Sequence, residues 1–168
     1  MNSEFPQKQI HQDALFPEIS KLKTILPPNK TIGSFEDYQQ KYPYSKSYFS
    51  NQQFTQRECI TSDLISILIK SSLYTSQVQE KINLYIQDLY NKQYSVLTIT
   101  TLSGGNPTDV KDWVTSQYQQ GVKGVVFIGN IPAAWAEVSD EQFPCDLFYM
   151  DVDGSWIDAN IGYGVVIL

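Results

Sequence analysis

The chain has 168 residues, of which 42% are hydrophobic and 18% are charged, so its composition is that of one globular domain and excludes a disordered chain. A formal net charge of -6 argues against a nucleic-acid partner, because phosphate neutralisation requires a basic patch. No run of about 18 apolar residues occurs, so no membrane span is expected. No signal peptide is visible near Met1, and the cellular location stays open.

Residues 1–57 form a polar first zone, rich in Pro, Gln, Asn, Lys, Ser and Tyr, and we expect a loosely structured lead-in there. One short helix is expected within it, because Ser34 is a good N-cap and Asp37 follows three residues later. From residue 58 to residue 168 the pattern becomes that of a folded α/β domain.

A strand and a helix open this second zone. The run from Leu64 to Ile69 is short, apolar and rich in β-branched residues, which is typical of a buried strand. Ser76 followed by Gln79 fits a capping box, so a helix is predicted from Ser76 to about Asn91. Its buried face, predicted from spacings of three and four residues, comprises Val78, Ile82, Tyr85, Ile86 and Leu89.

A second strand, a second helix and a third strand follow. A strand is predicted at residues 94–102. The next helix is expected to begin at Pro107 after Asn106 as N-cap, and Gly121 is expected to close it. Residues 124–129 are apolar throughout, so both faces of this strand should be covered. The predicted buried face of the helix comprises Val110, Trp113, Val114 and Tyr118.

The alternation of strands and helices predicts an α/β fold with a doubly wound, mainly parallel sheet. Three parallel strands leave apolar edges, which predict self-association through an exposed sheet edge. Residues 161–168 end on an apolar run, and we expect a truncated or frame-shifted chain.

The candidate nucleophiles lack a base. His11 is the one histidine and lies in the lead-in, so a dyad with Cys145 is not favoured and a packed structural cysteine is expected. Ser103 and Ser139 fail as hydrolase nucleophiles for the same reason. One histidine with Cys59 and Cys145 is also too few ligands for a His/Cys metal site, and the redox state of the two thiols stays open.

Two other groups of residues have competing interpretations. The turn at residues 103–106 precedes a helix, but it matches no phosphate-binding pattern and favours a plain tight turn. The aromatic residues Trp113, Trp135, Trp156, Phe148 and Tyr149 are expected in a core or an interface, in preference to a sugar-stacking platform.

A cluster of carboxylates near the C-terminus is a candidate calcium site. Asp151, Asp153 and Asp158 are the predicted metal ligands, with Asp146 nearby, because hard cations prefer closely spaced oxygens. The complete EF-hand pattern is absent, and a solvated acidic turn is the competing interpretation. Nothing in the spacing selects a glycosidase-type carboxylate pair.

Two stretches of the chain resemble the gingipain-type cysteine peptidases. They are residues 124–132 (GVVFIGNIP) and residues 143–156 (FPCDLFYMDVDGSW), and the order of the preceding strands and helices is similar as well. The likeness extends over about residues 58–160. Residues 58–168 are therefore interpreted as a partial gingipain-like domain, the first and non-catalytic subdomain of a caspase-like fold.

The resemblance implies an endopeptidase in which a Cys thiolate attacks the scissile carbonyl of a protein or peptide substrate and a His handles the proton. The family is generally exported. Its catalytic His and Cys motifs have no counterpart here, and neither Cys145 nor His11 matches them, so no catalytic residue is assigned. The chain is expected to be inactive alone. Two alternatives stay open: a non-catalytic module that binds calcium or a partner, and a small flavodoxin-like protein that binds a ligand where the strands end.

Overall fold

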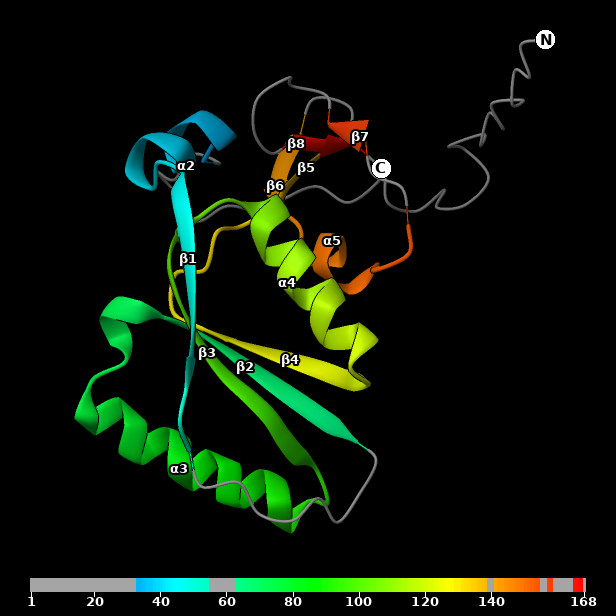
Figure 1. Cartoon of the computed structure of the whole chain (residues 1–168). Helices are drawn as coiled ribbons and strands as arrows, with labels where there is room; N and C mark the ends of the chain where they lie inside the picture. Colours follow the sequence, from blue (N-terminus) through cyan, green and yellow to red (C-terminus); the bar gives the residue numbers. More distant parts are fainter. Residues whose placement is uncertain (1–32, 55–62, 139–140, 155–156, 159–164, 168) are drawn as a thin grey trace, which may run out of the picture. The chain divides into compact units, whose positions relative to one another are not determined.

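The computed structural model describes residues 33–54, 63–138, 141–154, 157–158 and 165–167, all of which belong to the unit Gly33–Leu168. Its main feature is a four-stranded sheet with the order β1-β3-β2-β4 (Figure 1). β2 (Leu64–Lys70) pairs in parallel with β3 (Ser95–Gly105) on one side and with β4 (Val122–Ile128) on the other. β1 (Ser45–Gln52) is antiparallel to β3. The predicted α/β class with a mainly parallel sheet is confirmed.

The two long helices cover opposite faces of this sheet. α3 (Ser76–Asn91) packs Ile82 and Ile86 against Ile67 and Ile69 of β2. α4 (Pro107–Gln119) packs Val110, Trp113 and Val114 against the other face. The crossovers from β2 to β3 and from β3 to β4 therefore lie on different sides of the sheet, as predicted for a doubly wound fold (Figure 1).

A second, smaller sheet follows β4 and was not predicted. Its strand order is β6-β5-β8-β7, with β5 antiparallel to β6 and parallel to β8. The elements of this sheet and its surroundings are β5 (Trp135–Val138), β6 (Glu141–Pro144), α5 (Leu147–Met150), β7 (Ile157–Asp158) and β8 (Val165–Ile167). A 3-10 turn, η2 (Ser71–Leu73), follows β2.

The described part of the predicted lead-in contains two regular elements. α2 (Phe35–Lys41) begins with the capping box predicted at Ser34 and Asp37. β1 was not predicted, because it is an exposed strand with no apolar alternation. Backbone pairing with β3 holds it there, and Asn51 accepts a hydrogen bond of 2.9 Å from the Thr100 hydroxyl.

The predicted cap of α4 is confirmed, whereas that of α3 is wrong. Asn106 and Asp109 form a capping box, Pro107 begins the helix, and Gly121 follows it at φ +88°. In α3 the N-cap is Thr75, not Ser76, and its side chain makes no capping hydrogen bond.

The predicted burial of two tyrosines and of one strand is wrong. Tyr85 and Tyr118 are 39% and 57% exposed, because both helices bury a narrower stripe than the spacing indicated. β4 is only partly buried along most of its length, because it is an edge strand and no described strand pairs with its outer side.

Gln117 replaces Tyr118 on the buried face of α4. It is 5% exposed, and its Oε1 accepts hydrogen bonds from the Ser66 hydroxyl (2.8 Å) and the Thr98 hydroxyl (3.1 Å). Ser66 lies on β2 and Thr98 on β3, so one glutamine side chain satisfies buried polar groups of two strands.

We predict that Gln117→Leu lowers the free energy of unfolding by about 1–3 kcal/mol, because both hydroxyls lose their shared acceptor inside the core. Gln119→Leu on the exposed side of the same helix is the matched control and should change it by less than about 0.5 kcal/mol. Urea unfolding followed by circular dichroism measures both. Equal losses in the two variants would contradict the assigned role of Gln117.

Candidate functional site

A pocket of about 290 Å³ lies where the parallel strands end. We call it the carboxyl-end pocket. β2 contributes its last residue, Lys70, and β3 contributes Gly104 and Gly105. The segment after β4 contributes Asn130, and Lys41 lies at the end of α2. Ligands of open α/β sheets bind at this edge, where loops from neighbouring strands leave toward opposite faces.

Two glycines with positive φ let the walls of this pocket approach closely. A Cβ on Gly104 (φ +68°) would lie 2.3 Å from the carbonyl oxygen of Lys46, so β1 begins directly against the end of β3. A Cβ on Gly129 (φ +90°) would lie 3.0 Å from the Cβ of Lys70 and 2.4 Å from Leu73. The chain leaving β4 therefore runs tightly against Lys70, which confines that side chain at its base.

Aromatic residues brace the pocket from the side of α2. The Ala133 amide donates a hydrogen bond of 2.8 Å to the Tyr38 hydroxyl, and the Tyr44 hydroxyl donates one of 3.3 Å to the Ala133 carbonyl. Trp135 of β5 packs against Phe35 and Tyr38, with ring centroids 6.1 Å and 5.5 Å away. Burial raises the pKa of Tyr38 and of Tyr44, so both phenols are neutral near pH 7.

The polar side chains of this pocket are mainly hydrogen-bond donors. Lys41 and Lys70 supply two ammonium groups, and Ser45 and Asn130 supply an exposed hydroxyl and an exposed amide. Within the described part of the chain, no Asp, Glu, His or Cys lines it. A carboxylate, imidazole or thiolate base is therefore not present among these lining residues.

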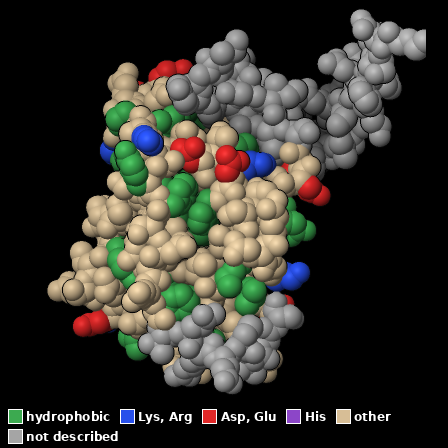
Figure 2. Space-filling model, viewed as in Figure 1, with side chains coloured by type: hydrophobic (Ala, Val, Ile, Leu, Met, Phe, Trp, Pro, Cys, Tyr) green, Lys and Arg blue, Asp and Glu red, His purple; other side chains and the backbone are tan. Residues whose placement is uncertain are grey.

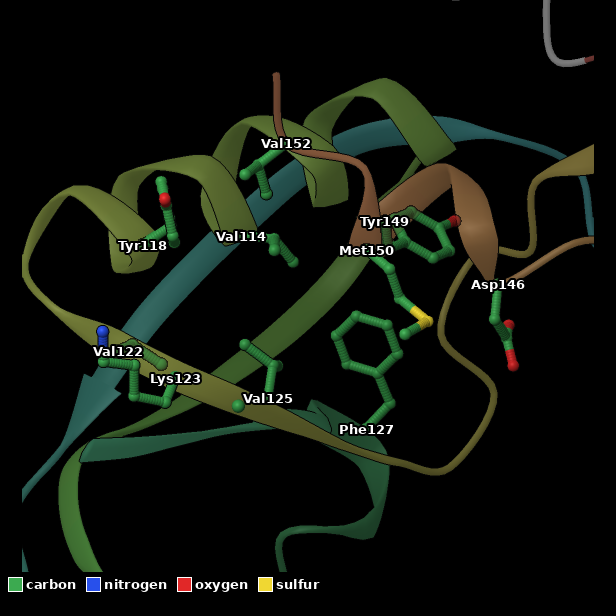
Figure 3. A pocket seen from close by; sticks show the side chains of 11 residues that line it. Val114, Tyr118, Val122, Lys123, Val125, Phe127, Asp146, Tyr149, Met150 and Val152 are labelled. Atoms are coloured by element: carbon green, nitrogen blue, oxygen red, sulfur yellow. The ribbon is translucent and has the colours of Figure 1, made fainter. Parts of the chain in front are cut away.

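A second cavity, of about 500 Å³, runs beside β4 and is called the β4 groove (Figure 3). Its floor is apolar: Val125 and Phe127 project from β4, and Val114 projects from α4. Two large apolar side chains on its rim face solvent, since Met150 is 75% and Tyr118 57% exposed. Figure 2 shows hydrophobic side chains in several places on the surface in that view, with a group near its centre.

Opposite charges lie at the two ends of this groove. Lys123 belongs to the start of β4, and Asp146 lies just before α5 (Figure 3). Between them the groove is lined almost entirely by apolar groups, so it matches an apolar partner better than a polar one.

Tyr149 of α5 closes the groove toward the sheet. Its hydroxyl donates a hydrogen bond of 2.5 Å to the Pro132 carbonyl, and its ring meets Phe127 edge-on at 5.4 Å between centroids. Burial raises the pKa of Tyr149 far above its ordinary value, and the neighbouring Tyr44 adds to the shift. The phenol is thus a fixed hydrogen-bond donor that ties α5 to the segment after β4.

Two of the three predicted calcium ligands lie in the turn after α5. Asp151 and Asp153 are in this turn and Asp158 is in β7, and no group of three or more His, Cys, Asp or Glu among the described residues is arranged to hold a metal ion. The Lys111 ammonium donates hydrogen bonds to the carbonyl oxygens of Phe148 (2.9 Å) and Asp151 (2.7 Å). The Lys111 ammonium therefore satisfies these two carbonyl oxygens. Calcium binding by the aspartates stays a prediction.

No histidine is among the described residues, so none is placed beside the candidate nucleophiles there. Cys145 is a partly buried free thiol whose backbone amide donates a hydrogen bond of 2.9 Å to the Ala134 carbonyl. His11, Cys59 and Ser139 lie outside the described residues. Ser103 is exposed and belongs to β3, which continues to Gly105 and leads directly to the capping box of α4. The tight turn predicted at residues 103–106 is therefore wrong, because this stretch pairs with β1 as part of the strand.

The predicted placement of the aromatic residues is confirmed where they are described. Trp113, Trp135, Phe148 and Tyr149 are all less than 10% exposed and pack in the core, so they form no open stacking platform; Trp156 lies outside the described residues. The carboxyl-end pocket itself was missed as a set of residues, because Lys41 and Lys70 are isolated in the sequence.

Comparisons with known proteins leave the family open. No family model, curated protein or solved structure matches this chain. Among the described helices, none combines the length and the apolar character needed to cross a membrane, in line with the sequence-based expectation.

We predict that ionisation of the Tyr149 phenol destabilises the folded protein in alkali. Its folded-state pKa is raised above the unfolded value of 10.0, so its contribution is complete below pH 10 and is lost as the pH rises further. Above pH 10, the free energy of unfolding of the wild type should therefore fall more steeply than that of Tyr149→Phe, by about 1.4 kcal/mol per pH unit. At pH 7 the variant should be about 1 kcal/mol less stable, because the bond to Pro132 is missing.

Urea unfolding at a series of pH values from 7 to about 11 measures both effects. Parallel curves for the wild type and Tyr149→Phe above pH 10 would contradict the assignment of a buried, neutral phenol.

Proposed function

We propose that this chain is the first, non-catalytic subdomain of a gingipain-like cysteine endopeptidase with a caspase-like arrangement of strands. In this proposal it is the scaffold beside which the catalytic strands pack, and the substrate is a protein or a peptide. The observation that carries the proposal is the open, apolar edge strand β4 with the β4 groove beside it. An edge strand of this kind requires a partner strand or a cover.

The sequence and the structure support this proposal at the same place. The two stretches that resemble the peptidase family, residues 124–132 and 143–156, contain most of β4 and all of α5. These two elements form two sides of the β4 groove. Part of each resembling stretch therefore borders this one apolar groove, whereas Asn130 and Pro132 line the carboxyl-end pocket.

The chemistry of the chain agrees with a scaffold role. The full sequence has one histidine and two cysteines, and Cys145 lies in a described region without a histidine. A thiolate nucleophile requires a base within hydrogen-bond reach, so the catalytic pair in this proposal comes from other sequence. The specificity pocket would also be formed there.

The first test is to sequence the genomic DNA on both sides of the coding region and to translate every frame. The proposal expects adjacent coding sequence with a histidine-bearing strand followed by a cysteine-bearing strand. If neither flank encodes them, the peptidase proposal fails for this gene, and a binding module becomes the leading account.

The second test examines the β4 groove directly. The chain is co-expressed with the adjacent catalytic segment, and peptidase activity is measured with a fluorogenic peptide mixture. Met150→Lys and Tyr118→Lys should each lower activity at least tenfold, because each places an unpaired charge in an apolar interface. Both side chains are exposed, so the chain itself should still fold.

Leu84→Lys is the matched control for these variants. Leu84 is 60% exposed on α3, which covers the opposite face of the sheet, so this change should leave activity within about twofold of the wild type. Full activity in Met150→Lys and Tyr118→Lys would show that the catalytic segment packs elsewhere.

A further inference from the structure

The carboxyl-end pocket lies at the switch point of the sheet. β2 leads through η2 into α3 on one face, and β3 leads into α4 on the other face. The two connections depart in opposite directions, which leaves a crevice between the ends of the two strands. Lys70 at the end of β2 and Gly104 at the end of β3 line the pocket at this point.

We propose that the carboxyl-end pocket binds the oxyanion group of a small ligand, a phosphate or a carboxylate, between Lys41 and Lys70. This inference does not depend on the peptidase proposal. It concerns residues that line no part of the β4 groove.

The charge in the pocket is opposite to that of the protein as a whole. The chain has a net charge of -6, yet the described lining of this pocket includes two lysines and no acidic residue. In a protein of this net charge, a solvated face would be expected to contain carboxylates as well. At physiological ionic strength charges more than about 8 Å away are largely screened, so the net charge of the whole chain does not decide the potential within the pocket.

Lys70 is held in place without a carboxylate partner among the described residues. It is half-buried at the end of the central strand, and the chain after Gly129 runs against its base. A half-buried lysine commonly packs its methylene stem and keeps its ammonium accessible, so the Lys70 ammonium remains able to donate to a ligand in the pocket. Lys41 is fixed differently, because its Nζ lies 5.3 Å from the centre of the Tyr42 ring.

The size and the remaining donors fit a small oxyanion-bearing ligand. A volume of about 290 Å³ is at the lower limit of small-molecule sites. Ser45 and Asn130 add neutral donors to the ammonium groups, so the site can satisfy several oxygen atoms at once. The described lining residues include no carboxylate that would repel an oxyanion.

The experiment is a titration of the ¹⁵N-labelled full chain, followed by the amide shifts of Gly104 and Gly105. Inorganic phosphate and N-acetylglycine are added in separate series, each matched by sodium chloride at equal ionic strength. We expect saturable shifts at these glycines with at least one oxyanion and none with chloride. Lys41→Gln and Lys70→Gln should each weaken binding about fivefold, the effect of one charge at close range in a solvated site.

Lys123→Gln is the matched control, because it removes the same charge from the β4 groove and should leave the affinity unchanged. Saturation with phosphate alone assigns a phosphate-bearing ligand, saturation with N-acetylglycine alone assigns a carboxylate such as a peptide C-terminus, and saturation with both assigns an unselective oxyanion site.

Several results overturn the proposal. They are linear shifts equal to those in chloride, unchanged binding in both Lys41→Gln and Lys70→Gln, or an equal loss in Lys123→Gln. Amide-shift dispersion in each variant verifies folding. Because no peptidase assay enters this test, its failure leaves the scaffold proposal standing, and the reverse also holds.

Discussion

The burial of β2 on both faces is the constraint on which the rest of this fold depends. Ile67, Leu68 and Ile69 are each 0% exposed, and successive side chains of a strand point to opposite faces. Ile67 and Ile69 therefore require one cover and Leu68 another, which α3 and α4 provide. The chain reaches both faces only if the connections after β2 and β3 diverge. The crevice that holds the carboxyl-end pocket is thus a consequence of core burial.

The same constraint explains why β4 is left open. β2 is paired on both sides, by β3 and by β4, whereas the outer side of β4 meets no described strand. The antiparallel strand β1 protects β3 at the other edge and is polar, as expected for a strand facing water. β4 has only one charged residue, Lys123, and lacks this protection. An apolar edge beside an apolar groove is a feature that a partner would explain.

Local signals predicted the elements that depend on local physics. The apolar run of β2 and the cap of α4 could be read directly, because burial and capping act within a few residues. β1 could not be predicted, since its order comes from backbone pairing with distant β3. The burial of Gln117 depends on hydroxyl groups of two strands that are distant in sequence. The place of Lys70 in the pocket depends on four separate segments of the chain. Such sites exist only after the strands have paired.

One hydrogen bond connects the two candidate surfaces. Tyr149 lines the β4 groove, Pro132 lines the carboxyl-end pocket, and the Tyr149 hydroxyl bonds to the Pro132 carbonyl. Both rings that meet Tyr149 edge-on, Phe127 and Phe148, restrict its movement, so the link is a rigid one. A rigid wall reduces the ordering cost of binding a small ligand, because less conformational freedom remains to be lost.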